Sequence, residues 1–149
     1  MSGAAGPALV PALIVTGPVG VGKTSVAYEV SAVLAEAGVP HACLDIDTLR
    51  FAYPAPASDP FNLALGFRNL AAVWRNFQAA GALRLVCADV IEDRATLREY
   101  ERAIPGLRVT VARLRAPVDA LEDVLVETEA RSLREIALEV LARAGWPRP

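Results

Sequence analysis

The chain has 149 residues, which fits one domain over residues 1–149 with a sizeable hydrophobic core. Hydrophobic residues form 54% of the sequence, and this fraction excludes an intrinsically disordered chain. The net charge of −2 gives no basic excess, so we expect no nucleic-acid partner.

The first predicted elements are a buried strand, a glycine-rich turn and a helix. Residues 12–16 are a short apolar run that ends at Gly17, which is typical of a parallel strand. Apolar residues then recur at three- and four-residue spacing over residues 23–37, which predicts a helix that ends at Gly38. A second strand is expected over residues 41–46 and runs into an acidic cluster.

A proline-rich segment follows the second strand. Three prolines within residues 53–60 exclude a helix or a central strand there, so we expect a loop near the strand ends. Helical spacing returns over residues 61–80. The stripe of Leu70, Trp74 and Phe77 on this helix is expected to pack in the core.

The rest of the chain keeps the alternation of strands and helices. In chain order, the pattern predicts a strand, a helix, two strands and a last helix, over residues 83–88, 92–103, 107–114, 124–127 and 132–144. Ser132 and Glu135 have the spacing of a capping box at the start of the last helix. Such alternation predicts a parallel sheet covered by helices on both faces, with ligands at the carboxyl ends of its strands.

The clearest functional motif lies between the first strand and the first helix. It is the P-loop, G-x-x-x-x-G-K-[ST], whose backbone N–H groups curl around nucleotide phosphates at the positive end of a helix. In this motif the Lys23 ammonium bridges the β- and γ-phosphates, and the Thr24 hydroxyl binds Mg²⁺. We therefore predict ATP and Mg²⁺ as cofactors, with the phosphates bound by Gly17, Pro18, Val19, Gly20, Val21, Gly22, Lys23, Thr24 and Ser25.

An acidic pair, Asp45 and Asp47, follows the second predicted strand. Because side chains alternate along a strand, we expect the two carboxylates to point to opposite faces. Asp45 is then a ligand of the metal or of its water, and Asp47 is the catalytic base that accepts the proton of an acceptor hydroxyl. The alternatives are a helix or turn cap for Asp47 and a solvated strand-end charge for Asp45.

One further aspartate and three arginines complete the candidate site. Asp89 ends the third strand at the position of a Walker B aspartate, which predicts a metal ligand; the alternative is an aspartate that opens the next turn. Arg50, Arg68 and Arg94 are candidates for binding acceptor or transferring phosphate, since a guanidinium can bind two phosphate oxygens. The alternative for each arginine is a solvated surface position. Arg50 joins Lys23 and Asp47 as a predicted catalytic residue.

The cysteines and the only histidine predict no metal centre. Cys43 and Cys87 lie in strand-like runs and are expected to be small buried hydrophobes, and His41 has no partner at a zinc-ligand spacing. The apolar start lacks a basic region and a cleavage motif, and no run is long enough to span a membrane. We expect a cytoplasmic protein with no membrane partner.

Together these segments resemble adenylylsulfate kinase and its relatives among the small P-loop kinases. Asp45, Asp47 and Arg50 occupy the positions of that family's D-G-D-x-x-R motif, with Ile46 in place of the glycine. The family then has an asparagine and an L-G-F segment that leads into an arginine-bearing helix. These are matched by Asn62, Leu65, Gly66, Phe67 and Arg68. The resemblance covers about residues 11–94.

The resemblance implies a three-layer α/β domain of the P-loop NTPase fold. Its parallel sheet has five strands in the order 2-3-1-4-5 and is flanked by helices. The adenine would rest near the loop that runs from Thr128 to Arg131. The acceptor site would include Asp47, Arg50, Asn62 and Arg68, and Arg94 is a further candidate because of its guanidinium.

The sequence departs from the family at two places. The family follows its third strand with a serine-proline segment that helps form the acceptor site, whereas residues 91–94 read Ile-Glu-Asp-Arg, which leaves the acceptor open. The family also inserts an arginine-bearing lid between its fourth and fifth strands. Residues 116–123 contain no basic residue and barely supply a short helix, so we expect the lid to be absent.

The predicted function is transfer of the γ-phosphoryl group of Mg·ATP to a hydroxyl of a small molecule. The alternative is a lidless ATP-binding module that regulates or accompanies another protein, with little or no kinase activity. The enzyme is favoured if Arg113 or Arg131 reaches the phosphates. A GTP-dependent switch is disfavoured because Lys23 is the only lysine and no N-K-x-D guanine motif occurs. The sequence predicts no oligomeric state.

Overall fold

A parallel sheet forms the middle layer of the computed structural model, which describes residues 6, 8–114, 124–128 and 130–149. Four strands lie in the order β2-β3-β1-β4, as predicted, and a three-residue strand pairs with β4 at the edge. All neighbouring strands are parallel. The strands are β1 (Val10–Thr16), β2 (Ala42–Asp45), β3 (Leu85–Ala88), β4 (Leu107–Leu114) and β5 (Val124–Val126).

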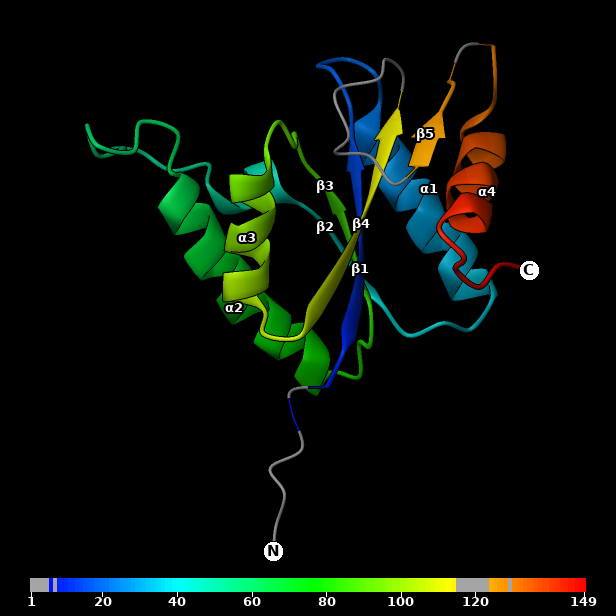
Figure 1. Ribbon diagram of the computed structural model, residues 1–149, viewed down its shortest axis with the longest axis horizontal. Helices are drawn as coiled ribbons and strands as arrows, with labels where there is room; N and C mark the ends of the chain where they lie inside the picture. The colour runs from blue at the N-terminus through cyan, green and yellow to red at the C-terminus, as the bar shows by residue number, and fades with distance from the viewer. Residues whose placement is uncertain (1–5, 7, 115–123, 129) are drawn as a thin grey trace, which may run out of the picture.

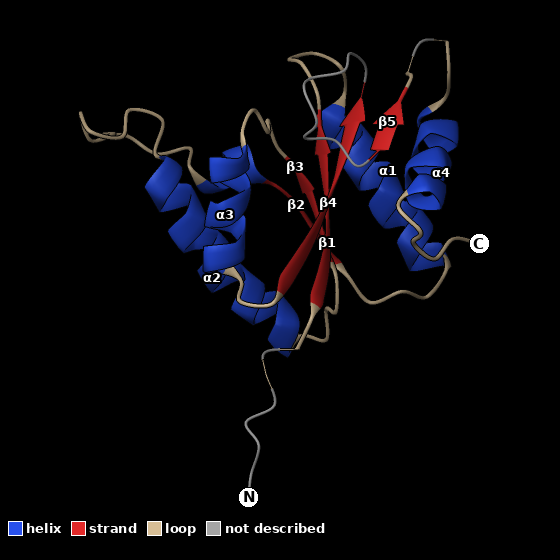
Figure 2. Cartoon of the chain, in the orientation of Figure 1, coloured by secondary structure: helices blue, strands red, loops and turns tan. Residues whose placement is uncertain are grey.

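Helices cover both faces of the sheet, which confirms the predicted parallel α/β architecture (Figure 1). On one face lie α1 (Lys23–Glu36) and α4 (Leu133–Arg143). On the other lie α2 (Leu63–Ala79) and α3 (Arg94–Ala103). Figure 2 shows the resulting three layers, with the loop between β2 and α2 extending beyond the helix ends.

The alternation of side chains along each strand divides the core in two. Leu13 and Val15 of β1 are buried against α1 and α4, whereas Ala12 and Ile14 are buried against α2 and α3. A strand covered on both faces is apolar at every position, and this explains the uninterrupted run that predicted it. Leu70 and Trp74 are buried and Phe77 packs against the same cluster, as expected.

Local hydrogen bonds determine where several elements begin and end. The predicted capping box of Ser132 and Glu135 is confirmed at the start of α4, whereas other predicted boundaries shift. The second strand was expected to reach residue 46, but it stops at Asp45, because that side chain accepts from the backbone N–H of Asp47 at 2.9 Å. Residues Ile46–Leu49 consequently form a short 3₁₀ helix. The helices α2 and α3 begin two residues later than predicted, after the turns that carry their caps.

The cysteines are free thiols, with Cys87 fully buried and Cys43 partly buried. Burial raises the pKa of the Cys43 thiol to about 11. Both ring nitrogens of His41 lie within 2.7 Å of a hydrogen-bonding oxygen, one of Ser31 and one of Val39. Among the described helices, none is long and apolar enough to cross a membrane.

Candidate functional site

The P-loop joins the carboxyl end of β1 to the first turn of α1. Gly22, the residue before the helix, has a left-handed conformation with φ of 91°, and no described side chain caps the helix. The Lys23 Nζ donates to the carbonyl oxygen of Pro18 at 3.2 Å, and the Val21 N–H donates to the same oxygen at 3.3 Å. With no described side chain capping the helix, the first N–H groups of α1 remain available to an anion.

Gly17 is required by the neighbouring strand. A Cβ atom at this position would lie 2.6 Å from the carbonyl oxygen of Leu114 on β4 and 2.9 Å from Cγ1 of Val21. Both distances are shorter than real Cβ contacts, so a larger residue would displace either the loop or the end of β4. The first glycine of the motif thus sets how closely the P-loop packs on the sheet.

A cleft of about 310 Å³ lies over the P-loop. Three aspartates from the ends of β2 and β3 line it, and this corrects the expectation that Asp45 and Asp47 point to opposite faces. The 3₁₀ turn after β2 replaces strand alternation and brings both carboxylates to the same cleft. Its lining is Val19, Gly20, Gly22, Lys23, Thr24, Ser25, Asp45, Asp47, Ala88, Asp89 and Val90.

Thr24 and Asp45 supply adjacent oxygen atoms in this cleft. The Thr24 hydroxyl donates to Oδ2 of Asp45, while Oδ1 of Asp45 accepts from the backbone of Asp47. The cap at this turn is therefore Asp45, and not Asp47 as the alternative prediction proposed. Mg²⁺ prefers oxygen ligands and is usually held by one or two carboxylates together with nucleotide phosphates. A hydroxyl beside a carboxylate fits that pattern, and in the described part of the chain no cluster of three metal-ligating side chains competes with it.

Asp89 is buried where β3 ends. Its Oδ2 accepts from the Tyr100 hydroxyl at 2.7 Å, and its Oδ1 accepts from the N–H of Val90 at 2.7 Å. Burial raises the pKa of this carboxyl to about 6, although both hydrogen bonds act in the opposite direction. The side chain is thus anchored through α3, and it still borders the P-loop cleft.

Asp47 and Arg50 form an ion pair across the short 3₁₀ turn. The Arg50 Nε donates to Oδ1 of Asp47 at 2.9 Å, and Nη2 contacts the same oxygen. Gly66 of α2 leaves room for the arginine, since a Cβ there would lie 3.2 Å from the Arg50 Cβ. Asn62 is buried beside them, and its amide donates to the carbonyl oxygens of Arg50 and Ala52 at 3.2 and 2.9 Å. Asn62 therefore fixes the backbone around Arg50.

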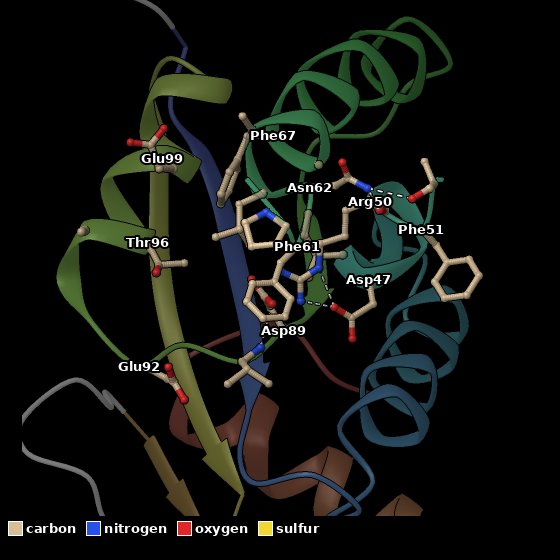
Figure 3. A pocket seen from close by; sticks show the side chains of 18 of the residues that line it. Asp47, Arg50, Phe51, Phe61, Asn62, Phe67, Asp89, Glu92, Thr96 and Glu99 are labelled. Carbon is tan, nitrogen blue, oxygen red and sulfur yellow. Dashed lines mark hydrogen bonds and ion pairs between the residues drawn. The ribbon is translucent and has the colours of Figure 1, made fainter. Parts of the chain in front are cut away.

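A second, larger cleft of about 1270 Å³ lies between the 3₁₀ turn, the start of α2 and α3 (Figure 3). We call it the aromatic cleft because Phe51, Tyr53 and Phe61 border it; they are 95%, 98% and 73% exposed, so they do not belong to the core. Asp47, Asp89 and Val90 line both clefts. The two clefts therefore meet at the carboxyl ends of β2 and β3.

Four predicted ligands do not line either cleft. Arg68 and Arg94 are exposed on α2 and α3. Arg131 donates to the carbonyl oxygen of Glu127 at 3.0 Å and pairs with Glu139, and Thr128 lies in the same loop beyond the cleft lining. The structure thus gathers the P-loop, the acidic residues, Arg50 and Asn62, and leaves these four residues outside.

Arg113 and Arg131, which were expected to distinguish a kinase from an ATP-binding module, also do not line the P-loop cleft. Arg113 is buried on β4 and donates to the carbonyl oxygen of Ile91 at 2.8 Å, and Arg131 is paired as described above. The predicted absence of a lid concerns residues 116–123, which lie outside the described residues. Nine residues, 115–123, connect β4 to β5.

Sequence reasoning missed the face of α3 that lines the larger cleft. Thr96 and Glu99 lie on α3 and border it, and so does Glu92, which precedes the helix (Figure 3). The three-residue spacing of Thr96 and Glu99 indicates a common helix face. The anchoring of Asp89 by Tyr100 had no such signal, because it depends on how α3 packs against β3.

Known proteins resemble this chain in sequence and in fold. The sequence model of the adenylylsulphate kinase family matches residues 10–123, and a search of curated proteins finds no match. Among solved structures, an APS kinase of Mycobacterium tuberculosis is 26% identical with a TM-score of 0.63 over 93% of this chain and 99% of that one. A gluconokinase from Sinorhizobium meliloti is 19% identical with a TM-score of 0.56 over 93% of each chain. A tunicamycin resistance protein of Deinococcus radiodurans is 18% identical with a TM-score of 0.61 over 93% of this chain and 98% of that one.

Proposed function

The chain belongs to the adenylylsulphate kinase family, and we propose that it transfers the γ-phosphoryl group of Mg·ATP to a hydroxyl of a small molecule. The observation that carries this proposal is the junction of the two clefts. The P-loop cleft and the aromatic cleft share Asp47, Asp89 and Val90, so a phosphate on one side and a hydroxyl on the other would meet there. Such proximity is the main requirement of phosphoryl transfer.

The nucleotide side is supplied by the P-loop. The first N–H groups of α1 would hold the phosphates. The Lys23 ammonium donates a hydrogen bond to the Pro18 carbonyl oxygen in this structure, and it would donate to phosphate oxygens when ATP is bound. Thr24 and Asp45 would hold Mg²⁺, and Asp89 lines the same cleft. When bound, the metal neutralises charge that develops on the transferring group.

The acceptor side is supplied by the aromatic cleft. The acceptor oxygen forms a bond to the γ-phosphorus while the bond from that phosphorus to the leaving ADP oxygen breaks. Asp47 takes the hydroxyl proton, and Arg50 holds the Asp47 carboxylate in place through its ion pair. Asn62 would act through Arg50 by fixing its backbone.

A second function, that of an ATP-binding regulatory or partner module, is favoured by where the arginines lie relative to the P-loop cleft. Neither Arg113 nor Arg131 lines the P-loop cleft, and residues 115–123 include a single arginine, Arg115. A chain with a complete P-loop and no arginine at the γ-phosphate would bind ATP and turn it over slowly. In that case it acts as a regulatory or partner module.

Two measurements test the proposal. Calorimetry should show ATP binding that requires Mg²⁺ and is lost in Lys23→Ala, while Arg75→Ala, an exposed residue of α2, serves as the control. ADP release measured across a panel of hydroxyl-bearing metabolites should then rise with one class of acceptor. Equal ATP affinity of parent and Lys23→Ala would disprove nucleotide binding at the P-loop. Tight binding without any stimulation by an acceptor would favour the regulatory module.

The base is proposed to be adenine. The absence of an N-K-x-D motif supports ATP over GTP, because recognition of guanine in that motif requires a second lysine. A melting assay should show greater stabilisation by ATP than by GTP, and the reverse order would overturn the choice.

A further inference from the structure

The charges around the aromatic cleft indicate what kind of acceptor it takes. Five carboxyl groups line the cleft, and among the described residues a single guanidinium, that of Arg50, accompanies them. Arg50 is already paired with Asp47. The carboxyl groups belong to Asp47, Asp89, Glu92, Asp93 and Glu99.

The N–H groups at the starts of the two helices that border the cleft already donate to carboxylates, so they are not available to an anion. The start of α2 is capped by Asp59, whose two carboxylate oxygens accept from the N–H groups of Leu63 and Ala64 at 2.8 and 2.9 Å. The start of α3 is capped by Asp93, which accepts from the N–H and the hydroxyl of Thr96 at 2.8 and 2.9 Å. A helix N-terminus attracts an anionic ligand through these same N–H groups, and here the protein's own carboxylates use them.

The apolar part of the cleft favours a flat, uncharged body. Phe51, Tyr53 and Phe61 expose their rings on the loop before α2, while Phe67 packs edge-on against Tyr100 with ring centroids 5.1 Å apart. Exposed aromatic rings gain contact area by stacking on an apolar or aromatic ligand, and they also attract cations. An anion would lose its hydration in this cleft and find carboxylates as neighbours.

We infer that the acceptor is an uncharged or cationic molecule with an aromatic or otherwise apolar body and a free hydroxyl, and not an anion such as adenylylsulfate. This inference rests on the proposed function, since it takes the aromatic cleft as the acceptor side. It also separates this chain from the M. tuberculosis APS kinase whose structure holds AMPPNP and APS.

The test uses two series in which the ring is constant and the charge varies. The first is adenosine against adenylylsulfate. The second is tyrosol, tyramine and 4-hydroxyphenylacetate, which are neutral, cationic and anionic at neutral pH. Binding is measured by ligand-observed NMR in the presence of AMPPNP and Mg²⁺, and phosphoryl transfer by ADP release with ATP. We expect the neutral or cationic member of at least one series to bind about tenfold more tightly than its anion, or about 1.4 kcal/mol.

Matched variants locate the effect. Glu92→Arg should bring the anion's affinity to that of its neutral partner, whereas Glu101→Arg, an exposed change on α3 outside the cleft lining, should leave the preference unchanged. Phe61→Ala should weaken every member of a series that binds. Adenylylsulfate that binds as tightly as adenosine would overturn the inference, and so would the failure of all neutral and cationic members to bind at millimolar concentration. Preferential binding without phosphoryl transfer would support the inference and refute the kinase function.

Discussion

The hydroxyl of Tyr100 on α3 donates a 2.7 Å hydrogen bond to Oδ2 of Asp89 at the end of β3. Tyr100 is fully buried and Asp89 is 7% exposed, yet the carboxylate borders both clefts. This bond ties the position of α3, and with it one wall of the aromatic cleft, to the strand end beside the P-loop. Changes at either residue should therefore affect stability and activity together.

Replacing Asp89 by asparagine should change how stability depends on pH. Because burial raises the pKa of Asp89 from 3.8 to about 6, the folded state holds this proton more tightly than the unfolded state. The contribution of this proton to the free energy of unfolding is fully present below pH 3.8 and is lost as pH rises through about 6. Relative to the parent, Asp89→Asn should gain on the order of 3 kcal/mol between pH 4 and pH 7, since each unit of pKa corresponds to 1.36 kcal/mol.

Urea unfolding of the two proteins in EDTA, without nucleotide, measures this difference at each pH. The exposed variant Glu101→Gln controls for general charge effects. Parallel stability curves for Asp89→Asn and the parent would contradict the burial of an ionisable group at this position.

Replacing Asp47 by asparagine should slow transfer more than it weakens nucleotide binding. The amide keeps the shape of the carboxylate and removes the base, so kcat should fall by about 10²–10⁴-fold. The KM for ATP should change little. Steady-state kinetics with an identified acceptor provide the measurement, and Asp89→Asn is the comparison because Asp89 lines the same junction. A near-normal kcat in Asp47→Asn would refute the assignment of Asp47 as the base.

Adding a methyl group at Gly66 should disturb the site through Arg50. A Cβ at Gly66 would lie 3.2 Å from the Arg50 Cβ, so the arginine must shift by a few tenths of an ångström and its pairing with Asp47 weakens. The helix itself tolerates alanine better than glycine, by about 1 kcal/mol. Gly66→Ala should thus lower acceptor-dependent turnover without lowering the melting temperature.

A double-mutant cycle separates the two causes. If the effect passes through the arginine, Gly66→Ala should add nothing in an Arg50→Ala background. Full additivity of the two losses would mean that Gly66 acts on the cleft directly.

The short connection between β4 and β5 predicts a slow enzyme. A lid excludes water from the phosphates and brings arginines to the transferring group, and one such arginine contributes about 10³–10⁵ in rate in related reactions. Residues 116–123 contain no basic residue. ADP release should therefore be slow, and hydrolysis should be comparable to transfer or faster than it.

A graft tests this explanation. Inserting an arginine-bearing lid between Leu121 and Val124 should raise acceptor-dependent turnover and leave ATP affinity unchanged. Fast, strictly acceptor-dependent turnover by the parent chain would show that the phosphates are protected in another way.

The sequence predicted the fold well because its signals are local. An apolar run ending in glycine, the P-loop and the Ser132–Glu135 capping box each determine a short segment without help from the rest of the chain. The site was harder to predict. Alternation along a strand placed Asp45 and Asp47 on opposite faces, but the bond from the Asp47 N–H to the Asp45 side chain turns the chain and brings both to one cleft. The ion pair of Arg131 with Glu139 depends on the packing of α4, which no local pattern predicts.

Among the described residues, those that line the aromatic cleft all lie between Ile46 and Glu99, whereas the P-loop precedes them in the chain. Under the proposed function, recognition of the acceptor by these residues would be encoded in one uninterrupted stretch of the gene. A chimera that exchanges residues 46–99 with the corresponding stretch of a relative should exchange acceptor preference while the P-loop of the host is kept. Because Asp47, Asp89 and Val90 line both clefts, acceptor preference can diverge within a lineage through the other residues of this stretch, while these three positions and the P-loop are kept.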